Sequence, residues 1–66
     1  MRVVVNDEPR ETKAMTLAVL LEELGCAHEP SVAAAVDGQV IPRSHWSAQA
    51  LVAGTQIIVI RAAQGG

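Results

Sequence analysis

The order of apolar and polar positions near the start of the chain is typical of a β-hairpin. Residues 2–5 include three consecutive β-branched valines, and residues 6–9 favour a tight reversal of the backbone. The following segment, 10–13, is mostly polar and suits an edge strand that keeps one face in water. The pattern therefore predicts a first hairpin with its return arm at 10–13.

A helical period replaces the strand pattern in the next segment. Four leucines recur at spacings of three and four residues, which places them along one stripe of a helix: Leu17, Leu20, Leu21 and Leu24. Thr16 can cap the start of this helix, and Gly25 can end it in the left-handed conformation. The sequence predicts one helix of about nine residues at 16–24.

A second hairpin is indicated in the middle of the chain. Residues 33–36 form an apolar run, and the dipeptide Asp37-Gly38 that follows is a strong signal for a two-residue turn. Residues 39–41 can pair back as a short strand before Pro42 interrupts the ladder. The loop at 26–31 separates this hairpin from the helix.

The last part of the chain combines an irregular link with a final strand. Residues 43–50 show no sustained period and predict a turn or a short helical piece around Trp46. Residues 56–61 are the longest β-branched run and predict the last strand. Two hairpins, one helix and a last strand together indicate an α+β fold, in which a mixed sheet packs on a single helix.

The last strand has apolar residues on both faces, but one helix can cover only one face of such a sheet, so the apolar side chains of the other face stay uncovered by the helix. We expect one alternate pair, either Ile57 with Val59 or Ile58 with Ile60, to help form a docking face for a partner. The alternative is that loops or the link around Trp46 cover that face.

Composition narrows the classes of function. The 66 residues make one domain with an aliphatic core, since half are apolar and Trp46 is the only aromatic residue. The formal charge of −2 comes from five basic and seven acidic residues without a basic run, which argues against nucleic acid as a partner. No apolar stretch is long enough to span a bilayer, and the start has no signal-peptide pattern. We expect a soluble, cytoplasmic protein that does not bind membranes.

Few side chains offer catalytic or metal chemistry. His28 and His45 lie far apart in sequence without companion ligands, so we expect no metal site. Cys26 is the only cysteine, which excludes an internal disulfide, and it is more often a small packed residue than a nucleophile in such a place. Its role is left open.

The tryptophan and two of the arginines are candidates for contacts with a ligand or a partner. Trp46 is expected to plug one end of the core, with ligand stacking as the alternative. Arg43 and Arg61 either contact an acidic partner or are ordinary solvated arginines.

The strongest candidate for chemistry is the C-terminal segment, Ala62-Ala63-Gln64-Gly65-Gly66. Five extended residues reach about 17 Å, far enough to enter the active site of another protein. Gly65 and Gly66 lack Cβ atoms and can pass a narrow channel, which leaves an unhindered carboxylate at Gly66. Coupling to AMP would activate that carboxylate, and a sulfur nucleophile could then displace AMP to form a thiocarboxylate. The alternative is an inert glycine end.

Several segments in the same order resemble the ThiS family of sulfur carriers in thiamine biosynthesis. They are the helix stripe at 16–24, the segment 36–43 followed by Trp46, and 54–57 leading to Gly65-Gly66. The resemblance covers nearly the whole chain. It implies a ubiquitin-like β-grasp fold, a mixed sheet of four to five strands on one helix, as a domain at 1–62 with a flexible diglycine tail at 63–66.

The resemblance also implies the reaction and the partners. An adenylating enzyme of the ThiF type would activate Gly66 with ATP. Gly65 has no side chain, so it would let the end of the chain enter a narrow active-site channel. A cysteine desulfurase relay would deliver sulfur, and a thiazole synthase of the ThiG type would take it. This chain would be a protein co-substrate and not an enzyme, and it would bind no cofactor itself. Apart from the resemblance, our own hypothesis of a docking face on the last strand names Ile58, Ile60 and Arg61 as candidate docking residues.

Three alternatives stay open at this point. The same chemistry could serve another product, as in the small subunit of molybdopterin synthase. A protein modifier would join Gly66 to lysine amines of targets. A binding module would carry the tail without using it.

Overall fold

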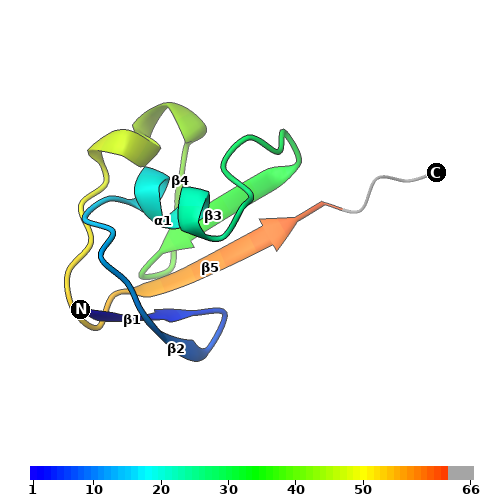
Figure 1. Ribbon diagram of the computed structural model, residues 1–66. Helices are drawn as coiled ribbons and strands as arrows, with labels where there is room; N and C mark the ends of the chain where they lie inside the picture. The colour runs from blue at the N-terminus through cyan, green and yellow to red at the C-terminus, as the bar shows by residue number, and fades with distance from the viewer. Residues whose placement is uncertain (63–66) are drawn as a thin grey trace.

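The fold of residues 1–62, which a computed structural model describes, is a five-stranded mixed sheet with its helices on one face (Figure 1). The strands follow the order β2-β1-β5-β3-β4 across the sheet. Their bounds are β1 Arg2–Val5, β2 Glu8–Glu11, β3 Val32–Val36, β4 Gln39–Ile41 and β5 Gln56–Arg61. The helices are α1, Leu17–Glu23, and a 3₁₀-helix η1, Arg43–Ala48. The α+β class expected from the pattern is confirmed.

The first hairpin, β1–β2, turns earlier than its sequence suggested. Asn6 and Asp7 alone make the turn, with φ of 50° and 67°, which fits the twist of a two-residue hairpin. The prediction of the return arm at 10–13 was therefore wrong by two residues at each end. Pro9 pairs with Val4 inside β2, which is tolerated because β2 is an edge strand and has no outer neighbour.

Helix α1 has the predicted cap and the predicted buried stripe. The Thr16 hydroxyl accepts a hydrogen bond from the Val19 N–H at 3.3 Å, and Gly25 ends the helix at φ 77°. The first three leucines of the stripe are fully buried, whereas Leu24 is half-buried at the C-cap. The helix itself is seven residues long, because the residues at both ends of the predicted range are its caps.

The second hairpin and η1 also match the expectation. Asp37 and Gly38 have φ of 49° and 84° and form the turn between β3 and β4. Trp46 lies on η1 beside α1 and is 5% exposed, and its Nε1 donates a hydrogen bond to the Ile41 carbonyl at 2.9 Å. The interpretation of Trp46 as a core residue is confirmed.

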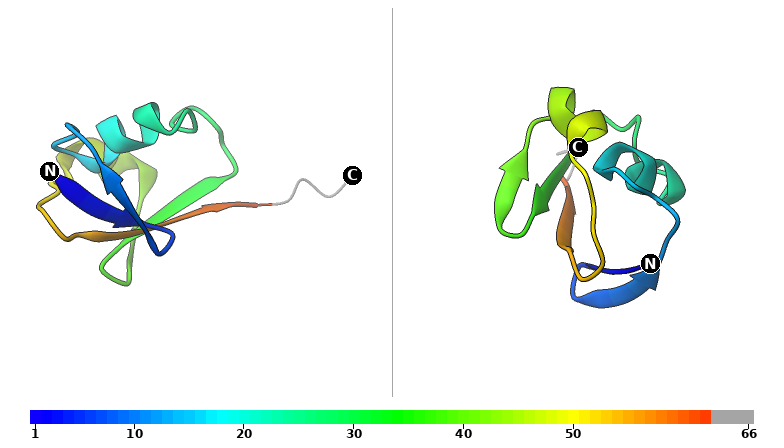
Figure 2. Two further views of the ribbon diagram at one scale, coloured as in Figure 1. Left: turned by 60° about the horizontal axis from the view of Figure 1, so that its bottom comes forward. Right: turned by 90° about the vertical axis from the view of Figure 1, so that its left-hand side faces the viewer.

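The last strand is the centre of the sheet. β5 pairs in parallel with β1 and antiparallel with β3, so every other strand is built around it. Ile57 is fully buried under α1, and Val59 is half-buried on the same side. Figure 2 shows α1 and η1 on one face of the sheet, with the other face open. No helix within residues 1–62 is long and apolar enough to cross a membrane.

Candidate functional site at the end of the last strand

The predicted reactive residues, Gly65 and Gly66, lie outside the described residues. The last described residue is Ala62, whose N–H donates a hydrogen bond to the Ser31 carbonyl at 3.0 Å. We call residues 59–62 the tail root, because they connect the central strand to the segment that carries the diglycine. The structure therefore shows how the body of the protein holds the start of that segment.

The Asn6 side chain holds the tail root on the side of β1. Its Oδ1 accepts a hydrogen bond from the Val59 N–H at 2.8 Å, and its Nδ2 donates to the Val59 carbonyl at 3.3 Å. The Asn6 backbone N–H also donates to the Ile57 carbonyl at 2.9 Å. The amide side chain thus continues the β1–β5 ladder for one more residue after the β1 backbone has turned away.

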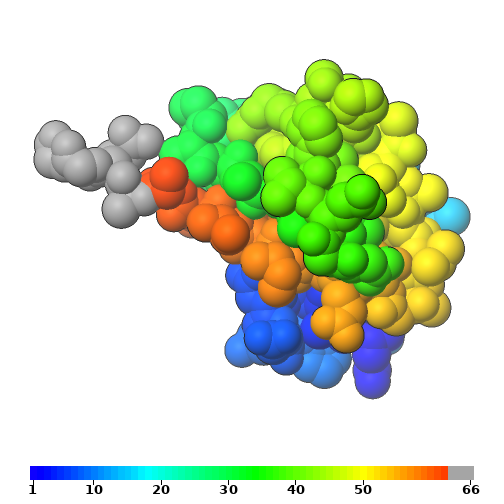
Figure 3. Space-filling view, turned by 180° about the vertical axis from the view of Figure 1, so that it is seen from behind, coloured from blue at the N-terminus to red at the C-terminus, as the bar shows by residue number. Residues whose placement is uncertain are grey.

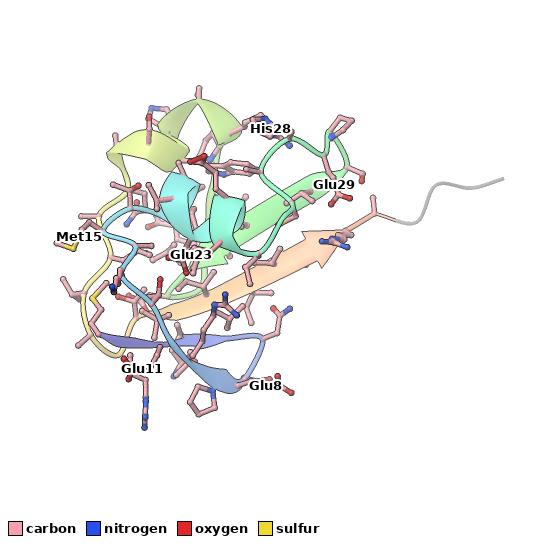
Figure 4. The ribbon with its side chains drawn as sticks, in the orientation of Figure 1. Glu8, Glu11, Met15, Glu23, His28 and Glu29 are labelled. Atoms are coloured by element: carbon pink, nitrogen blue, oxygen red, sulfur yellow. The ribbon has the colours of Figure 1, made fainter. Side chains whose placement is uncertain are left out.

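An ion pair holds the tail root on the side of the helix. Arg61 Nε lies 3.1 Å from Glu29 Oε2, and Glu29 belongs to the loop that precedes β3. Figure 4 shows Glu29 in that loop near the end of β5. Because about half of each side chain is exposed, we expect the pair to orient Arg61 more than to stabilise the fold. The expected docking role of Arg61 stays a prediction.

The open face of the sheet carries an apolar surface beside the tail root. Ile58 and Ile60 of β5 are 37% and 58% exposed, and Val40 of β4 is 71% exposed. In the strand register Ala35 lies between Ile58 and Val40, and Ala33 lies beside Ile60. We call these five residues the outer patch. Figure 3 views this side and shows β5 between β3–β4 and β1–β2 with no helix in front.

The exposure of the side chains shows which of the two predicted pairs of the last strand faces outward. Ile57 and Val59 pack toward the helix, and Ile58 and Ile60 are the exposed pair. The link around Trp46 does not cover them, because η1 packs against α1 on the opposite face.

The remaining candidates lie away from the tail root or inside the fold. Cys26 is 1% exposed with its thiol 3.7 Å from the Leu21 carbonyl, so it packs as a small core residue. His28 and His45 are both exposed, on separate segments. Among residues 1–62 no group of three His, Cys, Asp or Glu side chains is placed to hold a metal ion.

Arg43 has a structural position that neither sequence interpretation included. Its guanidinium donates to the Ala27 carbonyl at 2.8 Å and to the Glu29 carbonyl, and it stacks over the Trp46 ring at 4.3 Å from the ring centroid. The side chain therefore ties η1 to the loop between α1 and β3. Sequence reasoning also missed Asn6, which looked like an ordinary turn residue, because its bond to Val59 spans 53 positions of the chain.

The comparison with known proteins agrees with the fold described above. The model of the ThiS family matches residues 3–66. No curated protein matches the chain.

Two similar solved structures are of thiamine biosynthesis proteins from Geobacter metallireducens. The crystal structure of its ThiS is 23% identical, with all of both chains covered and a TM-score of 0.83. The solution structure is also 23% identical, covers all of this chain and 88% of that chain, and has a TM-score of 0.81. The likeness confirms the ubiquitin-like β-grasp fold that the sequence led us to expect.

Proposed function

The chain belongs to the ThiS family, and from this premise we propose that it carries sulfur for thiamine biosynthesis on the carboxylate of Gly66. The observation that supports this most directly is the extent of the family match, which runs through the diglycine to residue 66. A body whose central strand leads directly into that segment is suited to offering it to an enzyme. The chain would act as a co-substrate of its partners, not as an enzyme.

The proposed chemistry takes place in two steps at the Gly66 carbonyl. A carboxylate oxygen attacks the α-phosphorus of ATP, pyrophosphate leaves, and an acyl adenylate forms. A persulfide delivered by a cysteine desulfurase relay then attacks the carbonyl carbon and AMP leaves, which gives an acyl disulfide. A thiol of the relay attacks the relay-side sulfur of that disulfide, forms a new disulfide within the relay and releases the thiocarboxylate. A thiazole synthase of the ThiG type takes the sulfur.

In this proposal the adenylating enzyme, of the ThiF type, binds the ATP, and this chain binds no cofactor. Gly65 provides an approach without a Cβ atom, so a narrow channel can hold the backbone. We propose the cytoplasm as the compartment, in line with the lack of a signal-peptide pattern at the start of the sequence.

The outer patch is the surface that we propose for docking these partners. Ile58 and Ile60 are large apolar side chains exposed on the strand that leads to Gly66. Arg61 follows them on the same strand, but its side chain lies on the helix side, so it would contact a partner at the strand end and not within the outer patch. Burying each of these two side chains in an interface would contribute about 1–3 kcal/mol to the free energy of binding. Placing a carboxylate there should reverse that gain.

The docking surface can be tested by charge substitution at matched positions. Ile58→Asp and Ile60→Asp should each weaken binding of the adenylating enzyme about tenfold or more. Val52→Asp is the control, because Val52 is 67% exposed and lies outside the outer patch. Unchanged affinity of both isoleucine variants would exclude this face as the docking site.

The carrier function itself is tested by intact mass. The full chain is incubated with ATP, the adenylating enzyme and a sulfur source, and the C-terminal peptide should gain the mass difference between sulfur and oxygen. A chain without Gly65 and Gly66 is the control and should gain nothing. If the matched enzyme is active and the full chain gains no mass, the proposal is wrong.

A further inference from the structure

On the side where β1 ends, the tail root has a backbone edge that no other segment of residues 1–62 pairs with beyond Val59. Hydrogen-bonding groups of successive residues point to opposite sides of a strand. Val59 directs its N–H and carbonyl toward Asn6, and Ala62 directs its N–H toward Ser31. Arg61, two residues after Val59, therefore directs its N–H and carbonyl to the Asn6 side, beyond the last residue of β1.

No neighbouring strand of the described chain covers this edge. β1 pairs with β5 only through Val4 and Val5, opposite Gln56 and Ile57. The hairpin turn then leads the chain back along β2, and Figure 1 shows β5 continuing past that turn. Figure 4 places Glu8 near the tip of the hairpin and Glu29 on the other side of the strand end.

An apolar depression lies beside the same edge on the helix side of the sheet. It has a volume of about 390 Å³, and three of its walls are the half-buried apolar side chains Val5, Leu24 and Val59. Asn6 and Arg61 form its polar rim, and the buried Cys26 also lines it. The depression exists because β1 and α1 both end before β5 does.

From these features we propose that the tail root is a strand-pairing site for an extended segment of the enzyme that adenylates Gly66. The segment would lie in line with β1, exchange backbone hydrogen bonds with Arg61, and place one apolar side chain in the depression. Pairing of this kind takes affinity from backbone groups and selectivity from the side-chain pocket. The inference rests on the carrier function proposed above.

The length of chain beyond Ala62 determines which occupant fits. Only residues 63–66 separate the tail root from the reacting carboxylate, and four residues extend at most about 14 Å. An enzyme that holds Gly66 in its active site must therefore have the entrance of that site close to Arg61. The backbone edge at Arg61 would therefore lie next to the residues that form the entrance of the enzyme's active site.

The inference can be tested with a matched pair of substitutions. Arg61→Pro removes the N–H that we assign to the partner, and the bonds of β5 to β3 stay intact because this N–H faces away from β3. Arg61→Ala is the reference, because both variants lose the guanidinium and the Glu29 ion pair. The dissociation constant of the complex with the adenylating enzyme should be about tenfold higher for Arg61→Pro than for Arg61→Ala.

A second measurement on the unmodified chain covers the case in which Arg61→Pro does not fold. The Arg61 amide should exchange hydrogen fast in the free chain and become protected in the complex. The Ile60 amide, which faces β3, is the internal reference.

Equal dissociation constants for two folded variants, or an Arg61 amide that exchanges equally fast in the complex, would overturn the inference. The carrier function would stand if Gly66 were still adenylated in that experiment. If the enzyme does not adenylate Gly66 of the unmodified chain, the carrier function is wrong and the inference is wrong with it.

Discussion

At the scale of single residues, Asn6 combines a backbone and a side-chain role. Its φ of 50° is unfavourable for most residues, and its amide makes two hydrogen bonds to Val59. Asn6→Gly keeps the backbone conformation and loses the two bonds, so the free energy of unfolding should fall by about 1–2 kcal/mol. Asn6→Ala should cost about 1 kcal/mol more, because alanine adds strain at positive φ. Urea unfolding measures both, and equal stability of the unmodified chain and Asn6→Gly would contradict the bridging role.

Arg43 is the second residue whose role depends on distant contacts. Arg43→Ala should lower the free energy of unfolding by about 1–2 kcal/mol, because two backbone carbonyls lose a donor and Trp46 loses its stacked cation. The free energy of unfolding of Arg43→Lys should lie between those of the unmodified chain and Arg43→Ala, since an ammonium lacks the planar fork of donors. Chemical unfolding measures the stabilities. Weaker partner binding in Arg43→Ala at full stability would instead favour the acidic-partner interpretation.

At the scale of the elements, α1 depends on its cap because it is only seven residues long. Thr16→Ala removes the acceptor for the Val19 N–H and should cost about 1 kcal/mol of unfolding free energy. Thr16→Ser keeps a hydroxyl at the same place and should cost much less. Thermal or urea unfolding separates the two variants, and an equal loss for both would mean that the threonine methyl group matters more than the cap.

At the scale of the whole molecule, Cys26 reports on opening of the core. The thiol is 1% exposed and packs among α1, β1 and β5, so a thiol reagent can reach it only when these elements separate. We expect the alkylation rate to rise with urea in parallel with the unfolded fraction. Fast alkylation without urea would show that the depression beside Cys26 opens locally.

Much of the fold could be predicted because its signals are local. The leucine stripe with Thr16 and Gly25, the Asp37-Gly38 turn and the last strand each depend on residues close together in sequence. The first hairpin was misplaced because Pro9 looked like part of the turn, whereas the left-handed conformation of Asn6 and Asp7 completes the turn in two residues.

The sequence by itself determined the helix, the strands other than β2, the aliphatic core and the diglycine segment, because periodicity and turn chemistry act over a few residues. The tertiary structure decided which pair of β5 residues faces outward, because the side of the sheet that α1 covers depends on long-range pairing. It also decided the roles of Asn6 and Arg43, whose partners lie far along the chain. Hydrogen bonds between distant segments leave no pattern in a single sequence, since many residues can donate or accept them and only the fold brings the two groups together.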